Sequence, residues 1–148
     1  MIFVDQSISV ARARLVTLVD GAKVIDAARL LRNAGTDIVV ICDKDGVLVG
    51  VVTKTNIVEQ ISRCEGSACT TGISSIMVRD VVVCRPQDRM DDVWSRLKTH
   101  GLKNVPVMDE CSRPVGVLNA RDALQALMQE VEHEESLLRD YVMTVGYH

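Results

Sequence analysis

Two short polar segments carry the side chains of this sequence that could do chemistry. They read Thr53-x-x-Asn56 and Asn119-x-x-Asp122, and each follows an apolar run and opens a helical pattern. A helix N-terminus offers free N–H groups and a positive dipole end, which suit phosphate. A first-turn carboxylate can accept hydrogen bonds from both hydroxyls of a diol, so Asp122 fits better than Asn56, which has one carbonyl acceptor. Helix capping selects the same residue types and is the alternative explanation for both segments.

A gap-free internal repeat contains both segments. The stretch DAARLLRNAGTDIVVICDKDGVLVGVV, from Asp26, aligns with DVWSRLKTHGLKNVPVMDECSRPVGVL, from Asp92. The offset is 66 residues, the separation of Gly50 and Gly116, which stand just before the two polar segments. We expect the missing side chains of these glycines to let a ligand approach the backbone. Turn residues and apolar periods coincide at this one register, which indicates two copies of one unit.

Each copy is predicted to fold as β-α-β-β-α. The first strand is expected at residues 15–19 and 81–84, and Asp20 and Asp88 are expected to cap the following helix. The apolar face of that helix is predicted from its period. It comprises Val24, Ala27, Ala28 and Leu31 in the first copy and Met90, Val93, Trp94 and Leu97 in the second.

The second half of each copy is predicted to be a hairpin followed by a helix. Gly35 and Gly101 should end the preceding helix in a left-handed conformation. Turns DKDG and DECS join the hairpin strands, which are expected at 37–42, 47–52, 104–108 and 114–118. Pro106 has no N–H to donate, so its strand must lie at an edge or leave its N–H side free.

The last helical pattern is longer than its counterpart, because it continues from Ala120 to about Val145. A run of polar residues, 132–135, interrupts its apolar face. The pattern fits two helices that pack back on the domain, and it fits equally well one extension that pairs with another subunit.

Composition excludes several classes of protein. The 148 residues are 47% hydrophobic and 25% charged, as in globular domains. A net charge of −3 and an aromatic content of 3% argue against a nucleic-acid partner. No run approaches the roughly 18 apolar residues of a membrane helix. The start has no basic signal region, so we expect a cytoplasmic protein without a membrane partner. Five cysteines at irregular spacing, Cys64 and Cys69 among them, indicate neither a disulfide framework nor a zinc site.

The order of the elements resembles a tandem pair of CBS domains, as in stand-alone bacterial Bateman-module proteins. The resemblance rests on the repeated unit, the D-x-x-G-type turn and the segments G-V-V-T-x-x-N and G-V-L-N-x-x-D. It implies an α/β (α+β) fold in which two pseudo-twofold-related repeats pack through their sheets, with an extended C-terminal helix. The implied parts are repeat one at 8–63, a linker at 64–73, repeat two at 74–130 and a helical extension at 131–148.

The resemblance also implies a function and a site. Such pairs are regulatory sensors that bind an adenosine-containing nucleotide (AMP, ADP, ATP or NAD) or S-adenosylmethionine between the repeats. Mg²⁺ can accompany the phosphates, and the pairs form homodimers that signal to a separate protein partner. The first implied cleft sets Thr53, Thr55 and Asn56 against Val82, Leu102, Lys103 and Asn104. The second sets Val117, Asn119, Arg121 and Asp122 against Val16, Thr36, Asp37 and Ile38.

Roles within these clefts follow from side-chain chemistry. Lys103 and Arg121 are the cations expected to meet phosphate, with Arg79 a weaker third. Adenine should lie between aliphatic side chains, because aromatic ones are scarce; these are Val16, Val51, Val82 and Val117.

The sequence also bears on two other functions, a ligand-free scaffold and an enzyme. A dimeric scaffold that binds no ligand is the alternative, because Asn56 and Asn119 each depart from the family's Ser/Thr-x-x-Asp pattern. An enzyme is not expected, since the sequence shows no Cys-x-x-Cys motif, no Ser-His-Asp set and no paired-carboxylate cleft.

Overall fold

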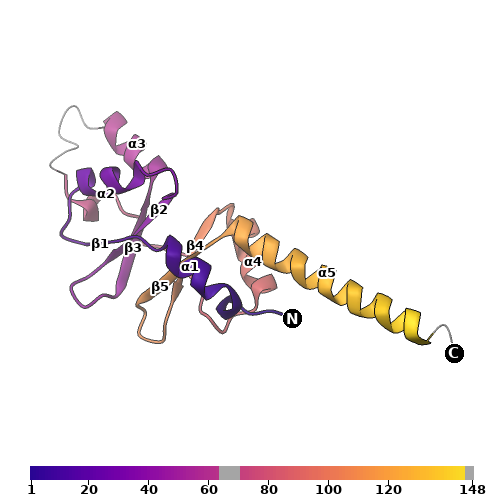
Figure 1. Ribbon diagram of the computed structural model, residues 1–148. Coiled ribbons are helices and arrows are strands. Elements are labelled where there is room, and N and C mark those ends of the chain that lie inside the picture. The colour runs from indigo at the N-terminus through magenta and orange to yellow at the C-terminus, as the bar shows by residue number, and fades with distance from the viewer. Residues whose placement is uncertain (64–70, 146–148) are drawn as a thin grey trace.

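The computed structural model describes residues 1–63 and 71–145 (Figure 1). Most of the predicted linker, with Cys64 and Cys69, therefore lies outside the described residues. Two short 3-10 helices, η1 and η2, span Val4–Ser7 and Ile73–Ser75. The α-helices are α1 (Ile8–Arg14), α2 (Val24–Leu31), α3 (Lys54–Arg63), α4 (Met90–His100) and α5 (Ala120–Val145). The strands are β1 (Thr17–Val19), β2 (Ile38–Cys42), β3 (Leu48–Thr53), β4 (Asn104–Met108) and β5 (Pro114–Asn119).

Repeat one forms the predicted three-stranded sheet. Strand β2 lies at its centre, parallel to β1 and antiparallel to β3. All five β2 residues are buried, which shows that both faces of the strand are covered. Val39 and Ile41 pack against the helices of the repeat, whereas Ile38 and Val40 belong to a cluster shared with Val117 of repeat two. The two repeats therefore pack through their sheets, as predicted.

Repeat two has a sheet of only β4 and β5, so the prediction of a strand at 81–84 is wrong. In repeat one the Val40 N–H donates to the Val16 carbonyl at 2.9 Å and holds the parallel pair. The residue 66 positions after Val40 is Pro106, which has no N–H. The pairing therefore shrinks to one bridge, in which the Cys84 N–H donates to the Pro106 carbonyl at 2.9 Å. The expectation that Pro106 lies on an edge strand is confirmed, because β4 has β5 as its one partner strand among the described residues.

Helix ends differ from the predictions in three places. Asp20 and Asp88 are not N-caps, because α2 and α4 begin after Lys23 and Arg89. The Asp88 carboxylate instead accepts from the Arg85 N–H and from the Arg96 guanidinium.

The two glycines that were expected to end helices in a left-handed conformation differ from each other. Gly101 ends α4 with φ of 62°, as predicted. Gly35 has no positive φ, because α2 ends four residues before it, at Leu31.

Each repeat is completed by the segment that precedes the other repeat. Residues of η1 and α1 pack on repeat two, where the Val4 N–H donates to the Asp88 carbonyl at 2.9 Å. Conversely, the Ile73 N–H of η2 donates to the Ala22 carbonyl of repeat one at 2.8 Å. Helix α1 was not predicted, although the spacing of Ile8, Ala11 and Leu15 is helical.

This exchange of segments between the repeats explains why residues 50 and 116 are glycines. It also corrects the role that was predicted for them. A Cβ on Gly116 would lie 2.8 Å from the backbone carbon of Ala11. A Cβ on Gly50 would lie 2.8 Å from Sδ of Met77 and 2.9 Å from the Val78 carbonyl oxygen. Ala11 and Met77 are themselves 66 residues apart. The glycines thus make room for the exchanged segments, and not for a ligand.

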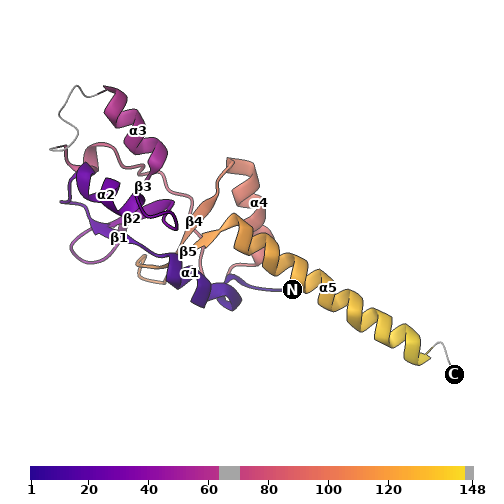
Figure 2. The same ribbon diagram turned by 45° about the horizontal axis from the view of Figure 1, so that its top comes forward.

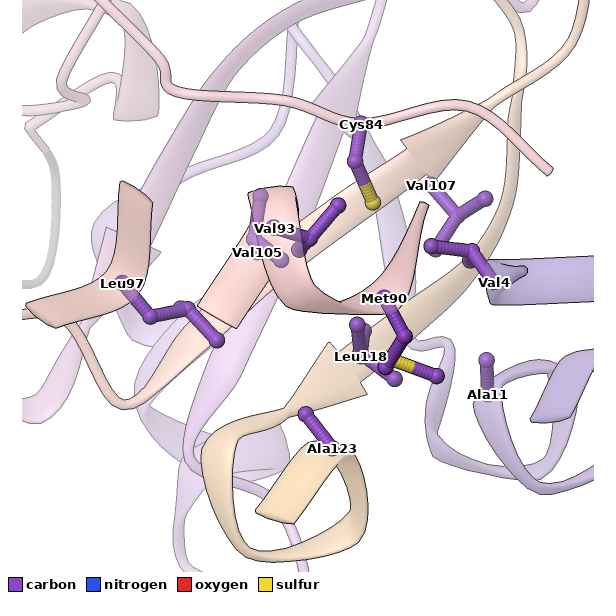
Figure 3. Close-up of a cluster of buried hydrophobic side chains, with 10 residues drawn as sticks. All are labelled: Val4, Ala11, Cys84, Met90, Val93, Leu97, Val105, Val107, Leu118 and Ala123. Atoms are coloured by element: carbon purple, nitrogen blue, oxygen red, sulfur yellow. The ribbon is translucent and has the colours of Figure 1, made fainter. Parts of the chain in front are cut away.

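The core of repeat two is drawn in Figure 3. Cys84 lies among Val93, Val105 and Val107, while Val4 reaches it from the N-terminal segment. The first half of α5 packs on this core through Ala123. Beyond that contact α5 runs outward as one continuous helix and leaves the body of the two repeats (Figures 1 and 2). The expectation of a second helix folding back on the domain is therefore wrong.

Candidate functional site

Both repeats line a cleft of about 740 Å³, here called the first cleft. Repeat one supplies the start of β2, the end of β3 and the first turn of α3, and repeat two supplies the chain before Cys84 and the α4–β4 turn. Predicted site residues in its lining are Asp37, Ile38, Val51, Thr53, Thr55, Asn56, Val82, Leu102, Lys103 and Asn104. Asp37 and Ile38 were predicted for the other cleft.

The first turn of α3 faces this cleft and carries a reciprocal cap. The Thr53 N–H donates to Oδ1 of Asn56 at 2.9 Å, and the Thr53 hydroxyl donates to the same oxygen at 3.0 Å. The Asn56 N–H in turn approaches the Thr53 hydroxyl at 3.5 Å. Capping therefore does occur here, as the alternative explanation requires. The remaining first-turn amides of Lys54 and Thr55 keep the free N–H groups that attract an anion.

The charges of the first cleft are mixed. Lys54 lies with its Nζ 3.9 Å from a carboxylate oxygen of Asp37, and both side chains are half exposed. Lys103 lines the same cleft from the α4–β4 turn, and Asp80 lines it from the segment before Cys84. An anionic group of a ligand can therefore meet a lysine in this cleft, and hydroxyl groups of a ligand can donate to a carboxylate.

Sequence reasoning missed several residues of this lining: Lys54, Val78, Asp80, Val81, His100, Gly101 and Pro106. Asp80 was within reach, because it stands two residues before Val82, which was predicted for this cleft. Arg79, the weaker third cation, donates to the Ser74 carbonyl at 3.1 Å and is not part of the lining.

The region related to the first cleft by the repeat, here called the second cleft, is spanned by an ion pair. Arg14 Nε donates to Oδ2 of Asp122 at 2.6 Å, and Nη2 donates to Oδ1 at 3.2 Å. This fork-to-fork contact raises the pKa of Arg14, chiefly through the hydrogen bond with Asp122. Both oxygens of the predicted diol acceptor thus already have a protein partner.

Several of the other residues predicted for the second cleft have protein partners of their own, whereas the Arg121 side chain is exposed. The Asn119 amide donates to Oδ1 of Asn104 at 3.0 Å, and its own Oδ1 accepts the Arg121 N–H at 2.9 Å. Thr36 and Val117 are buried, and Val16 packs against the core of repeat one. These contacts tie the second cleft into the fold more tightly than the first.

Two of the three described cysteines, Cys42 and Cys84, are buried and poorly suited to thiol chemistry. Burial raises the pKa of the Cys84 thiol to about 12, and burial also raises the pKa of Cys42. A thiol with a raised pKa is a poor nucleophile at neutral pH. In residues 1–63 and 71–145 there is no group of three side chains that could hold a metal ion. Within the same part of the chain we find no helix with the length and apolar character needed to span a bilayer.

Comparison with known proteins defines the class of protein. The CBS domain family model matches twice, at residues 6–63 and 73–129, so the chain belongs to the CBS domain family as a tandem pair. It is 27% identical over 109 residues to homoserine O-acetyltransferase of Methanococcoides burtonii. That match covers 74% of this chain and 21% of the enzyme, so the chain spans about a fifth of its relative's length.

Solved structures have the same fold. The CBS domain pair of protein MJ0100, in complex with 5′-methylthioadenosine and S-adenosyl-L-methionine, superposes with a TM-score of 0.73 at 22% identity. It covers 88% of this chain and 98% of its own. The cytosolic domain of the Mg²⁺ channel MgtE, in complex with ATP, gives a TM-score of 0.64 at 24% identity, over 76% of this chain and 45% of its own.

Proposed function

We propose that this chain is a regulatory module that binds an adenosine-containing nucleotide (AMP, ADP, ATP or NAD) in the first cleft. The observation that carries the proposal is the cleft itself, whose walls come from both repeats and include a helix N-terminus. A ligand there contacts two bodies at once, so it can favour one relative arrangement of them. Two solved structures of the same fold are complexes with adenosine compounds.

Each part of such a ligand has a partner in this proposal. The free amides of the α3 first turn and the ammonium of Lys103 bind phosphate. Val51 and Val82 flank the adenine ring. The Asn56 carbonyl or the Asp80 carboxylate accepts from the ribose hydroxyls. Mg²⁺, where phosphates bring it, prefers carboxylate oxygens such as those of Asp37 and Asp80.

The module acts through others in this proposal. It has no catalytic role, it assembles as a homodimer in the cytoplasm, and it passes its state to a separate protein partner. One observation favours the alternative of a ligand-free scaffold: Thr53 and Asn56 already satisfy each other at the helix start. The two functions differ in whether a nucleotide binds and changes the relative arrangement of the repeats.

Calorimetric titration of the ligand-stripped full chain distinguishes them. AMP, ATP, NAD and S-adenosylmethionine are titrated with and without Mg²⁺, and we expect micromolar binding of at least one of them. Lys103→Ala, in the first cleft, should weaken a phosphate-bearing ligand about tenfold, the effect of one charge-assisted hydrogen bond. Arg121→Ala removes a cation outside that cleft and should leave the affinity unchanged. Flat traces for all four ligands would establish the scaffold instead.

A further inference from the structure

Beyond the two repeats, α5 presents an apolar stripe that no other described element covers. Figures 1 and 2 show this helix projecting away from the body, and its contacts with α4, β5 and η1 lie at its N-terminal half. The side chains of the stripe, here called the α5 seam, are Leu124, Met128, Val131, Glu135, Leu138 and Val142. Its five apolar members are between 41% and 63% exposed, so the isolated chain leaves them in water.

The spacing of the seam specifies what can cover it. Successive members are separated alternately by four and three residues from Leu124 to Val142, which is the heptad spacing of a coiled coil. A flat protein surface does not require this spacing, whereas a second helix with the same period does. The seam is also a different face from the one that packs on the chain's own core through Ala123 and Leu127.

We propose that the α5 seam binds the α5 seam of a second copy of this chain. Self-pairing is favoured by period, since the same heptad appears on both helices. One complementary charge at the edge of the seam also favours it. Arg139 is the one arginine or lysine between residues 129 and 143, and the five carboxylates of that range otherwise repel a second copy, so Arg139 decides how the two helices are placed. In a parallel pair Arg139 faces Glu134 of the second copy, and in an antiparallel pair it faces Glu132.

Glu135 is the polar member of the seam. Arg139 Nη2 lies 3.0 Å from its carboxylate, so its charge is already paired at the seam's edge. A single polar residue in an otherwise apolar heptad fixes register and lowers affinity. The dimer held by this seam is therefore specific and reversible. The inference depends on α5 alone and not on the ligand of the first cleft.

The test is the mass of the full chain in solution, by light scattering or sedimentation over a range of concentrations. We expect wild type to approach twice the mass of one chain. Val131→Glu and Leu138→Glu should each shift the species to a single chain. Ser136→Glu adds the same charge on the same helix but outside the seam, and should stay a dimer. Circular dichroism and nucleotide binding of all three variants should match wild type, because the substituted side chains are exposed and distant from the cleft.

Two results would overturn the proposal. One is a wild-type chain that remains single at all concentrations, which would leave the seam to a different protein. The other is Val131→Glu and Leu138→Glu with the mass of wild type, which would place the contact between copies elsewhere on the molecule. Neither result bears on nucleotide binding in the first cleft.

Discussion

The first and second clefts are built on one plan but differ in how their helix starts are partnered. At the first cleft Thr53 and Asn56 cap each other, and the cavity in front of them stays open. At the second cleft the equivalent carboxylate of Asp122 is held in a two-point ion pair with Arg14. The residue related to Arg14 at the first cleft is Asp80, of opposite charge.

The difference shows that the exchanged segments decide the state of each cleft. The segment before repeat one brings an arginine to the second cleft, whereas the segment before repeat two brings an aspartate to the first. A carboxylate held by a bidentate guanidinium has fewer free lone pairs for a ligand, and its charge is already balanced. We therefore expect one nucleotide per chain, in the first cleft.

The largest expected effect concerns the contact that holds the exchanged segments in place. Gly116→Ala puts a Cβ 2.8 Å from the Ala11 backbone, and α1 must move to relieve the clash. We expect a loss of about 3 kcal/mol in the free energy of unfolding, measured by urea denaturation. Gly50→Ala should cost less, because two of the three atoms it meets belong to the flexible Met77 side chain.

Gly72→Ala is the matched control for both glycine variants. A Cβ at Gly72 meets nothing within 4 Å, and its φ is −70°, which alanine adopts freely. Its stability should equal or slightly exceed that of wild type. Equal stability of Gly116→Ala and Gly72→Ala would contradict the close approach of α1 to β5.

The second prediction concerns the ion pair between Arg14 and Asp122, which is present at the second cleft and absent from the first. Arg14→Ala should cost about 1 kcal/mol of stability, because the pair is partly exposed. It should also raise the number of AMP or ATP molecules bound per chain from one toward two in a calorimetric titration, since Asp122 is released. Arg12→Ala, an exposed arginine of the same helix, is the control and should change neither quantity. A stoichiometry unchanged by Arg14→Ala would show that the ion pair is not what closes the second cleft.

How far the sequence predicts the molecule depends on whether a contact is local. The periods and the turns at Asp43 and Asp109 predicted strands β1 to β5, because these signals lie within one repeat, and the 66-residue offset predicted the tandem family. The exchange of segments could not be predicted, because the partners are far apart in the sequence; Ala11 and Gly116, for example, are separated by 105 residues.

The ligand-binding roles of the site residues stay predictions. Ten of these residues line the first cleft, although Asp37 and Ile38 were expected in the second. The Arg14–Asp122 pair was missed, because nothing local to either residue indicates the other.

The third prediction concerns Asn56→Asp, which places a carboxylate in the first cleft at the position that Asp122 occupies in the second. Asn56→Asp should raise the affinity for AMP about three- to tenfold, because a charged acceptor roughly doubles the strength of the hydrogen bonds to ribose. If Asn56 serves only as a cap, the variant will gain stability at the helix start without any gain in affinity. Asn33→Asp makes the same change outside the cleft lining and should leave the affinity unchanged.

The smallest change in stability is expected at Pro106, where the sheet of repeat two lacks a backbone N–H donor that the sheet of repeat one has. Pro106→Val restores an N–H on the side of β4 that faces Val82, where repeat one has the Val40 to Val16 hydrogen bond. We expect the new amide at position 106 to exchange slowly with solvent, as the Val40 amide should. Stability should change by less than about 1 kcal/mol, because one hydrogen bond is gained while the conformational restriction of proline is lost. Fast exchange at position 106 would mean that residues 81–84 avoid the sheet for a reason other than the missing donor.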